Sequence, residues 1–115
     1  MVYGLRKVKQ MKEIFRLKEM LEKENIPFEF VENEEMEGYQ IAYPKYYKST
    51  SIIQCDISVV QHKYSYGNDD NLLEIWDMRN NYDVEGYLSA EFVFERIRKR
   101  YEASYKQVKD GEIDE

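Results

Sequence analysis

The sequence predicts an α+β fold: a four-stranded antiparallel meander with an N-terminal and a C-terminal helix packed on one face (α-β-β-β-β-α). Strand-like alternation fills the middle of the chain, and amphipathic helical spacing occupies both ends. The connections between the strands are short, which favours a meander because parallel pairing needs a long crossover. A chain of 115 residues is sufficient for one domain. We expect that domain over residues 1–108, followed by a disordered acidic tail at 109–115.

The stretch 51–76 predicts a long central hairpin. In an extended chain its first half places Ile53, Cys55, Ile57 and Val59 on one side, and Gln54, Asp56, Ser58, Val60 and His62 on the other. This alternation is typical of a strand with one buried and one wet face. A glycine and three Asn or Asp residues at 67–70 mark the turn, and residues 72–76 return as the second strand.

Two further strands precede this hairpin. Residues 28–32 alternate apolar with acidic side chains, residues 33–38 are a polar turn, and residues 39–43 form a strand that Pro44 ends. Residues 45–50 are expected to be a connection. The polar, turn-rich stretch 77–86 is expected to be a loop.

The two helices are predicted from apolar residues three and four positions apart. The first runs over residues 7–25 and ends before Pro27. The second follows Ser89, a favourable N-cap, and fades beyond Tyr105. Their apolar stripes are Val8, Met11, Ile14, Phe15, Leu17 and Leu21, and Ala90, Val93, Phe94, Ile97 and Tyr101. Both helices are expected on the same sheet face, since that face must be covered.

Composition and charge narrow the class of protein. The mean hydropathy is -0.78, but eleven tyrosines, five phenylalanines and a tryptophan supply enough apolar surface for folding. No apolar run approaches the ~20 residues of a membrane span and no signal peptide is recognisable, so a cytoplasmic protein is expected. The net charge of -6 is segregated. Residues 96–109 hold six cations and one carboxylate, whereas residues 64–95 hold one cation and eight carboxylates.

The motifs of common enzymes are missing, so no catalytic residue, metal or cofactor is expected. The sequence has no phosphate-binding glycine loop, zinc-ligand set or serine elbow. Cys55 is expected to be a small core residue on the strand face opposite His62, which disfavours a catalytic pair. Asp69, Asp70 and Glu74 lack calcium-loop spacing and are interpreted as solvated turn carboxylates. A hydrolase built on His62 remains a third alternative.

Tyrosines and carboxylates form the candidate binding surface. Some of the tyrosines are expected to fill the core, but the strands are too short to hide all of them, and surface tyrosine is favoured where partners dock. The tyrosines concerned are Tyr39, Tyr43, Tyr46, Tyr47, Tyr64, Tyr66, Tyr82 and Tyr87. The rings and lysines at 43–48 resemble a single-stranded nucleic-acid binder, but the net charge disfavours direct nucleic-acid binding. A negative face is expected from Glu29, Glu32, Glu34, Glu35, Glu37, Asp69, Asp70, Asp77, Asp83 and Glu85, and such a face can occupy the nucleic-acid groove of a basic protein. The alternative is a solvated surface that only aids solubility.

Three segments together resemble a known group of proteins. They are residues 26–30 leading to 38–41, residues 58–62 with 65–67 and 72–75, and residues 86–91 with 93–97. The pattern, over about residues 8–101, is similar to small proteins encoded by phages and prophages of Gram-positive bacteria. The resemblance implies an accessory protein that binds and disables a host component, such as an antiviral defence system. It implies no catalytic residues.

The leading hypothesis is therefore a small non-enzymatic protein that binds and inhibits a host protein in the host cytoplasm. A nuclease of an antiviral system, as for anti-CRISPR proteins, is one such partner. The predicted binding residues are Tyr43, Tyr46, Tyr47, His62, Tyr64, Tyr66, Asp69, Asp70, Glu34, Glu35 and Glu37. The alternative is a small-ligand protein that sequesters a nucleotide signal near His62, Tyr64 and Tyr66. A homodimer through an exposed edge strand stays open.

Overall fold

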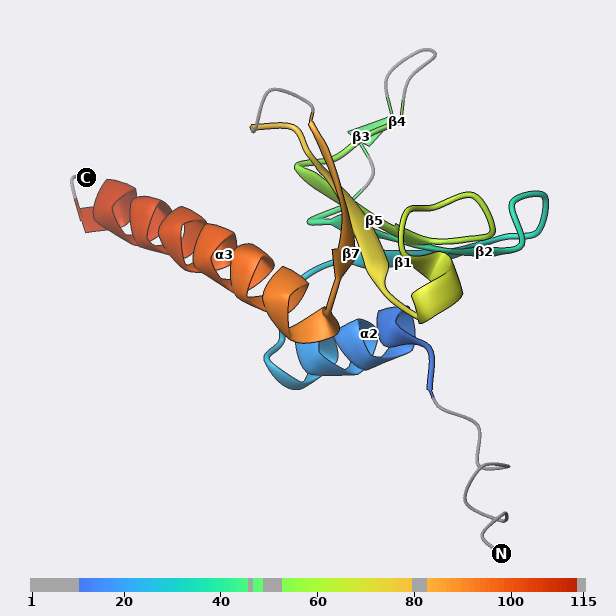
Figure 1. Ribbon diagram of the computed structural model, residues 1–115. Helices are drawn as coiled ribbons and strands as arrows, with labels where there is room; N and C mark the ends of the chain where they lie inside the picture. The colour runs from blue at the N-terminus through green and yellow to red at the C-terminus, as the bar shows by residue number, and fades with distance from the viewer. Residues whose placement is uncertain (1–10, 46, 49–52, 80–82, 114–115) are drawn as a thin grey trace, which may run out of the picture.

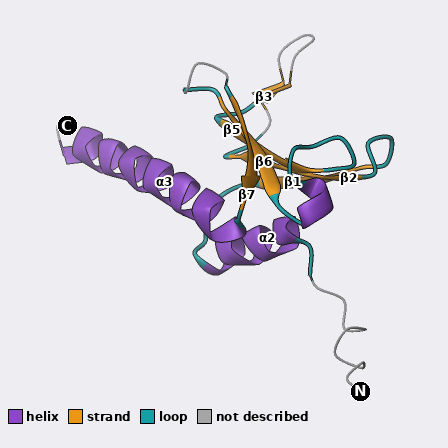
Figure 2. Ribbon diagram, viewed as in Figure 1, coloured by secondary structure: helices purple, strands orange, loops and turns teal. Residues whose placement is uncertain are grey.

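The computed structural model describes residues 11–45, 47–48, 53–79 and 83–113, which form an α+β fold (Figure 1). A five-stranded antiparallel sheet lies above two helices, α2 and α3, and a small hairpin projects from the sheet (Figure 2). In chain order the elements are α2 (Glu13–Lys23), β1 (Glu29–Asn33), β2 (Gly38–Tyr43), β3 (Tyr47–Lys48), β4 (Ile53–Gln54), β5 (Ile57–Gln61), the 3-10 turn η1 (Asn68–Asp70), β6 (Leu73–Asp77), β7 (Val84–Leu88) and α3 (Ala90–Ile113). Neither helix in these ranges has the length and apolar character that a membrane crossing requires.

The main sheet is the expected meander with an additional strand. Its order is β1-β2-β5-β6-β7, and every neighbouring pair is antiparallel. The predicted central hairpin is confirmed as β5 and β6, with Ile57 opposite Asp77 and Val60 opposite Glu74. Between β2 and β5 the chain forms the two-stranded β3–β4 hairpin, where the sequence suggested a connection leading directly into a strand.

The prediction of four strands in this sheet was wrong, because β7 was assigned to a loop. β7 pairs only with β6 and forms one edge of the sheet, so its side chains are exposed or half-buried rather than alternately buried. Its pairing is also irregular: the register shifts between Leu73 and Ile75, and Tyr87 has a positive φ of 60°. A short, irregular edge strand needs no apolar alternation, and its first three residues fall within the turn-rich stretch 77–86 that was assigned to a loop.

The strand predicted over residues 53–62 is divided in two. At Asp56 the backbone N–H donates to the carbonyl of Tyr43 at 2.8 Å, and the carbonyl accepts from the N–H of Met78 at 3.0 Å. These bonds replace ladder pairing where the chain passes from β4 to β5. Ser58 was expected on the wet face but is buried, and its hydroxyl accepts a hydrogen bond from Gln40 Nε2 at 2.8 Å.

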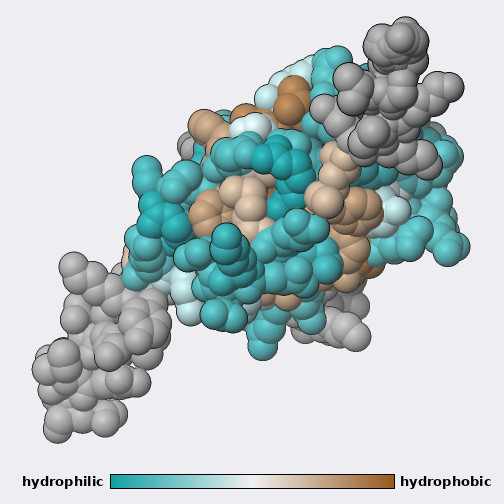
Figure 3. Space-filling model, turned by 90° about the horizontal axis from the view of Figure 1, so that it is seen from below, coloured by the Kyte–Doolittle hydropathy of each residue, from teal (hydrophilic) through white to brown (hydrophobic). Residues whose placement is uncertain are grey.

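A single core lies between the sheet and both helices, which confirms their placement on one face. Strands β2, β5 and β6 contribute Ile41, Tyr43, Ile57, Val59, Leu73 and Ile75, and the helices contribute Ile14, Leu17, Leu21, Ala90, Val93 and Ile97. The face of the molecule seen from the helix side is mostly hydrophilic, with small hydrophobic areas between the hydrophilic ones (Figure 3). The apolar stripes predicted for the helices are therefore confirmed where the structure describes them, with the exception of Met11, which is exposed.

The two helices start differently. Helix α2 begins at Glu13, later than the predicted residue 7, although residues 7–10 lie outside the described part of the chain. Helix α3 begins as predicted, since Ser89 Oγ accepts a hydrogen bond from the N–H of Phe92 at 3.1 Å. It then continues beyond Tyr105 to Ile113, into the stretch for which the acidic tail was predicted.

Candidate functional site

Two segments that are distant in sequence meet at one end of the sheet. The β1–β2 turn contributes residues 34–37, and the β5–β6 loop contributes residues 62–72. The N–H of Lys63 donates to the carbonyl of Met36 at 3.1 Å, and Lys63 Nζ lies 2.6 Å from a Glu37 carboxylate oxygen. Gly38 permits this approach, because a Cβ there would lie 2.4 Å from His62 Cα. We call the combined surface the acidic end.

The acidic end gathers eight of the eleven predicted binding residues. These are Glu34, Glu35, Glu37, His62, Tyr64, Tyr66, Asp69 and Asp70; the five carboxylates are all exposed. Tyr64 exposes 67% of its surface and Tyr66 exposes 61%. Tyr87 of β7, also 61% exposed, joins them through its N–H, which donates to the carbonyl of Tyr66 at 3.2 Å. Three exposed rings therefore lie among carboxylates at one end of the molecule.

The β5–β6 loop is held in place by its own hydrogen bonds. The N–H of Tyr66 donates to Glu74 Oε1 at 2.8 Å, and the Ser65 hydroxyl donates to the carbonyl of His62 at 2.8 Å. Gly67 has φ 101°, a conformation that strongly favours glycine, and it allows the turn into η1. The tyrosines of this loop are thus presented on an ordered backbone.

The imidazole of His62 contacts Tyr64 of the same loop. Its Nδ1 accepts a hydrogen bond from the N–H of Tyr64 at 3.1 Å, and its ring lies edge-on to Tyr64 with centroids 6.4 Å apart. A general base is normally oriented by an acceptor such as a carboxylate. Among the residues that the structure describes, the imidazole is hydrogen-bonded to the backbone of Tyr64 and not to a carboxylate.

Two of the other predicted binding residues, Tyr43 and Tyr47, do not lie at the acidic end. Tyr43 faces the helices and is only 3% exposed, so its assignment to a binding surface was wrong. Tyr47 lies in the β3–β4 hairpin, and Tyr46 lies outside the described residues. Two carboxylates assigned to the negative face, Asp77 and Glu85, are instead paired with arginines of α3.

These pairs form a network at the opposite end of the sheet. Asp77 is 2% exposed; Arg100 Nη2 donates to it at 2.7 Å and Arg96 Nη1 at 3.4 Å. Arg96 also binds both carboxylate oxygens of Glu85, each at 3.1 Å. Burial raises the pKa of the Asp77 carboxyl, but hydrogen bonds from Arg100 and from the backbone of Arg79, with the charges of Arg100 and Arg96, outweigh it and lower the pKa below its ordinary value.

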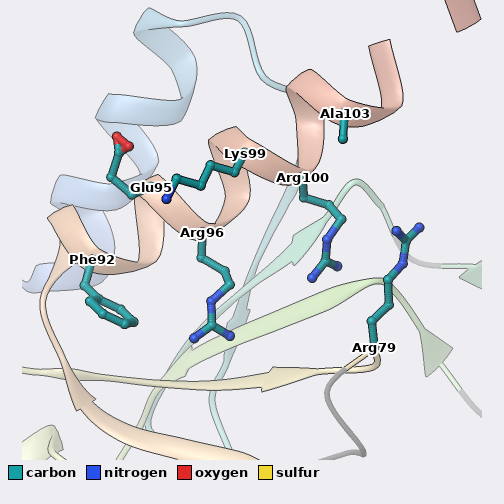
Figure 4. A pocket seen from close by; sticks show the side chains of 7 residues that line it. All are labelled: Arg79, Phe92, Glu95, Arg96, Lys99, Arg100 and Ala103. Atoms are coloured by element: carbon teal, nitrogen blue, oxygen red, sulfur yellow. The ribbon is translucent and has the colours of Figure 1, made fainter. Parts of the chain in front are cut away.

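Beside this network a pocket of about 390 Å³ opens between α3 and the turn after β6 (Figure 4). Its lining residues are Arg79, Phe92, Glu95, Arg96, Lys99, Arg100 and Ala103. The sequence analysis missed this site because it counted the cations of residues 96–109 only as part of the segregated charge. The available signal was the spacing of positions 92, 96, 99, 100 and 103, which places them on one helix face.

Within the described ranges no group of three or more His, Cys, Asp or Glu side chains is placed to hold a metal ion. The fold and these two surfaces define an α+β protein with an acidic, ring-bearing end and a cationic pocket. Comparison with family models, characterised proteins and solved structures finds no match to this chain.

Proposed function

We propose that this chain is a small non-enzymatic protein of phage type that binds and inhibits a nucleic-acid-binding host protein, such as an antiviral nuclease, through its acidic end. The observation that carries this proposal is the joint exposure of Tyr64, Tyr66 and Tyr87 beside the carboxylates of residues 34–37 and 69–70. A group of exposed rings marks an interaction site more often than rings that are scattered singly over a surface. Their grouping at one end therefore supports docking there.

The charges define the kind of partner. Five exposed carboxylates lie on the two segments of the acidic end, and Lys63, whose Nζ lies 5.1 Å from the centroid of the Tyr64 ring, is paired with one of them, Glu37. Such a surface attracts a basic groove and accelerates association at low salt. Tyrosine adds apolar contact area with a hydroxyl and loses little conformational entropy. Together these features mimic the charge of a nucleic acid, with rings where stacked bases would contact a protein.

The structure favours this proposal over sequestration of a nucleotide near His62. The rings of Tyr64 and Tyr66 are more than half exposed on the loop, whereas a small-ligand site encloses most of its ligand. The pocket of Figure 4 is lined by none of the predicted binding residues. A large, basic surface fits the exposed rings better than a small molecule does.

The test is capture of the partner from the lysate of a Gram-positive host on the immobilised protein. We expect recovery of a basic nucleic-acid-binding protein that is released by salt and by competing DNA. The double variant Tyr64→Ser/Tyr66→Ser and the double variant Glu34→Gln/Glu35→Gln should each weaken recovery at least about tenfold. The matched charge control is Glu19→Gln/Glu24→Gln, two exposed carboxylates on the α2 side of the molecule. Unchanged recovery with the acidic-end variants, or a partner insensitive to DNA, contradicts the proposal.

A further inference from the structure

The cationic pocket lies away from the acidic end and is not used by the proposed function. Arg79 reaches it from the turn after β6, and Phe92, Arg96, Lys99 and Arg100 reach it from α3 (Figure 4). In the sheet, the register places Asp77 beside Ile57, whereas Gln61 and Tyr39 lie toward the acidic end. The two surfaces are therefore at opposite ends of the strands, and a variant in one leaves the other intact.

The carboxylates near the pocket do not satisfy all of its cations. Glu85 and Asp77 occupy the guanidinium of Arg96, and Asp77 binds only Nη2 of Arg100. Nη1 of Arg100 is buried without a hydrogen-bond partner. Arg79 lies 3.6 Å from Asp56, at the long end of an ion pair. Lys99 forms no ion pair in the described part of the chain, although the charge of Glu95, which also lines the pocket and is paired with Arg98, interacts with it.

A cluster of cations with unpaired N–H donors favours the binding of an anion. Guanidinium groups bind phosphate through paired N–H donors, and lysine adds a mobile point charge. Collecting like charges at one place costs free energy that a bound dianion offsets. These donors therefore match the oxygen atoms of a phosphate group.

Phe92 adds a second recognition element to the same pocket. Half of its surface is exposed, and the guanidinium carbon of Arg96 lies 5.6 Å from the ring centroid. An exposed ring at the rim of a cationic pocket offers a stacking surface for a flat organic group. The pocket volume of about 390 Å³ is typical of small-molecule sites.

The geometry points to a binding site for a small organic phosphate with a planar ring, such as a nucleoside monophosphate. Arg79 and Lys99 contact the phosphate group, Arg100 adds its charge from the pocket lining, and Phe92 stacks on the ring. The guanidinium of Arg96 remains with Glu85 and Asp77 and forms the floor between the two parts. Binding at this site does not require the acidic end.

The experiment titrates the full chain with AMP, inorganic phosphate or adenosine and follows backbone amide NMR shifts and calorimetric heats. We expect AMP to bind with shifts centred on Arg79, Phe92 and Lys99, phosphate to bind the same residues more weakly, and adenosine alone not to bind. Arg79→Gln and Lys99→Gln should each lower the affinity for AMP about tenfold. Both side chains are exposed, so these variants are expected to fold. Lys12→Gln is the matched control for charge loss at an exposed position elsewhere.

A separate variant tests the stacking of Phe92 on the ring of the ligand. Phe92→Ala should weaken the binding of AMP but leave the binding of inorganic phosphate unchanged. Absence of any AMP-dependent shift at about 10 mM ligand, where even very weak sites are occupied, overturns the proposal. AMP binding that is unaffected by Arg79→Gln and Lys99→Gln overturns it as well. Tyr64→Ser/Tyr66→Ser should retain AMP binding, so failure here and failure of the protein-binding proposal are separately visible.

Discussion

The N–H of Ala90, at the start of α3, donates to the Glu13 carboxylate of α2 at 2.7 Å. The same carboxylate accepts from Arg16 Nη1 at 2.8 and 3.0 Å, and Arg16 also binds Glu91 in the first turn of α3. A carboxylate at a helix N-terminus satisfies a free amide and interacts favourably with the helix dipole. One buried side chain thus joins the starts of both helices.

Replacing Glu13 with alanine should lower the free energy of unfolding by about 1–2 kcal/mol, as for loss of a helix cap. Glu13→Gln keeps an acceptor for the N–H of Ala90 but loses the ion pair with Arg16. It should therefore lower the free energy of unfolding less than Glu13→Ala does. Urea unfolding at pH 7 measures both. Glu19→Ala, at an exposed position of the same helix, should stay within about 0.5 kcal/mol of wild type. Equal losses for Glu13→Ala and Glu19→Ala would exclude a capping role.

Asn71 performs the corresponding role for α2. Its Oδ1 accepts the N–H of Glu13 at 3.0 Å and the Nε2 donor of Gln61 at 2.8 Å, while its Nδ2 donates to the carbonyl of Met11. Its φ of 56° is left-handed. Asn71→Gly removes only the side-chain bonds and should cost about 1 kcal/mol.

Asn71→Ala should cost about 1–2 kcal/mol more than Asn71→Gly, because alanine in the left-handed region is strained. Chemical unfolding of the two variants in parallel separates the hydrogen bonds from the backbone conformation. If the Asn71→Ala variant is as stable as the Asn71→Gly variant, residue 71 does not keep the left-handed conformation.

Asp77 should make the protein sensitive to acid. Folding lowers the pKa of this carboxyl, so its stabilisation is complete above about pH 4 and is lost as the pH falls through the lowered value of the folded state. Asp77→Asn leaves two arginines without their buried partner and should cost about 3 kcal/mol at pH 7. It should also flatten the dependence of stability on pH below 4. Unfolding between pH 3 and 7 tests this, with the exposed Asp70→Asn as control; an unaltered acid profile would refute the assignment.

Cys55 should be unreactive in the folded protein. Burial and the charge of Asp56 raise the pKa of this thiol to about 11, against a weaker lowering effect of a hydrogen bond with the backbone of Tyr43. Alkylation requires the thiolate, so iodoacetamide at pH 8 should label the native chain at least about tenfold more slowly than the chain in urea. Mass spectrometry of the time course measures the ratio. Equal rates would mean that the thiol is accessible.

Several features of the fold were predictable because neighbouring residues encode them. The alternation in β5 marked Ile57 and Val59 as core residues, and both are fully buried. Ser89 was recognisable as the N-cap of α3 from its position before the apolar stripe. The carboxylates and tyrosines of the acidic end were recognised as a surface, although their meeting depends on the fold around Gly38.

The features that were missed depend on distant partners. The strand β7 pairs with β6, although its first three residues belong to the turn-rich stretch 77–86. Tyr43 looked like a surface ring next to a lysine, but the strand orientation turns it toward the helices. Asp77 and Glu85 looked like solvent carboxylates, and only the passage of α3 over this edge pairs them with Arg96.

The sequence by itself determined the α+β class, the apolar faces of the strands and helices, and the grouping of charge along the chain, because each depends on spacing within one segment. Only the tertiary structure decided where α2 begins, which carboxylates are free, and that a cationic pocket exists. Ile14 is capped by Gln61, 47 positions away, and Ala90 by Glu13, 77 positions away. Contacts of this range are favourable only once the sheet has formed, since the chain must first lose the entropy of closing those loops.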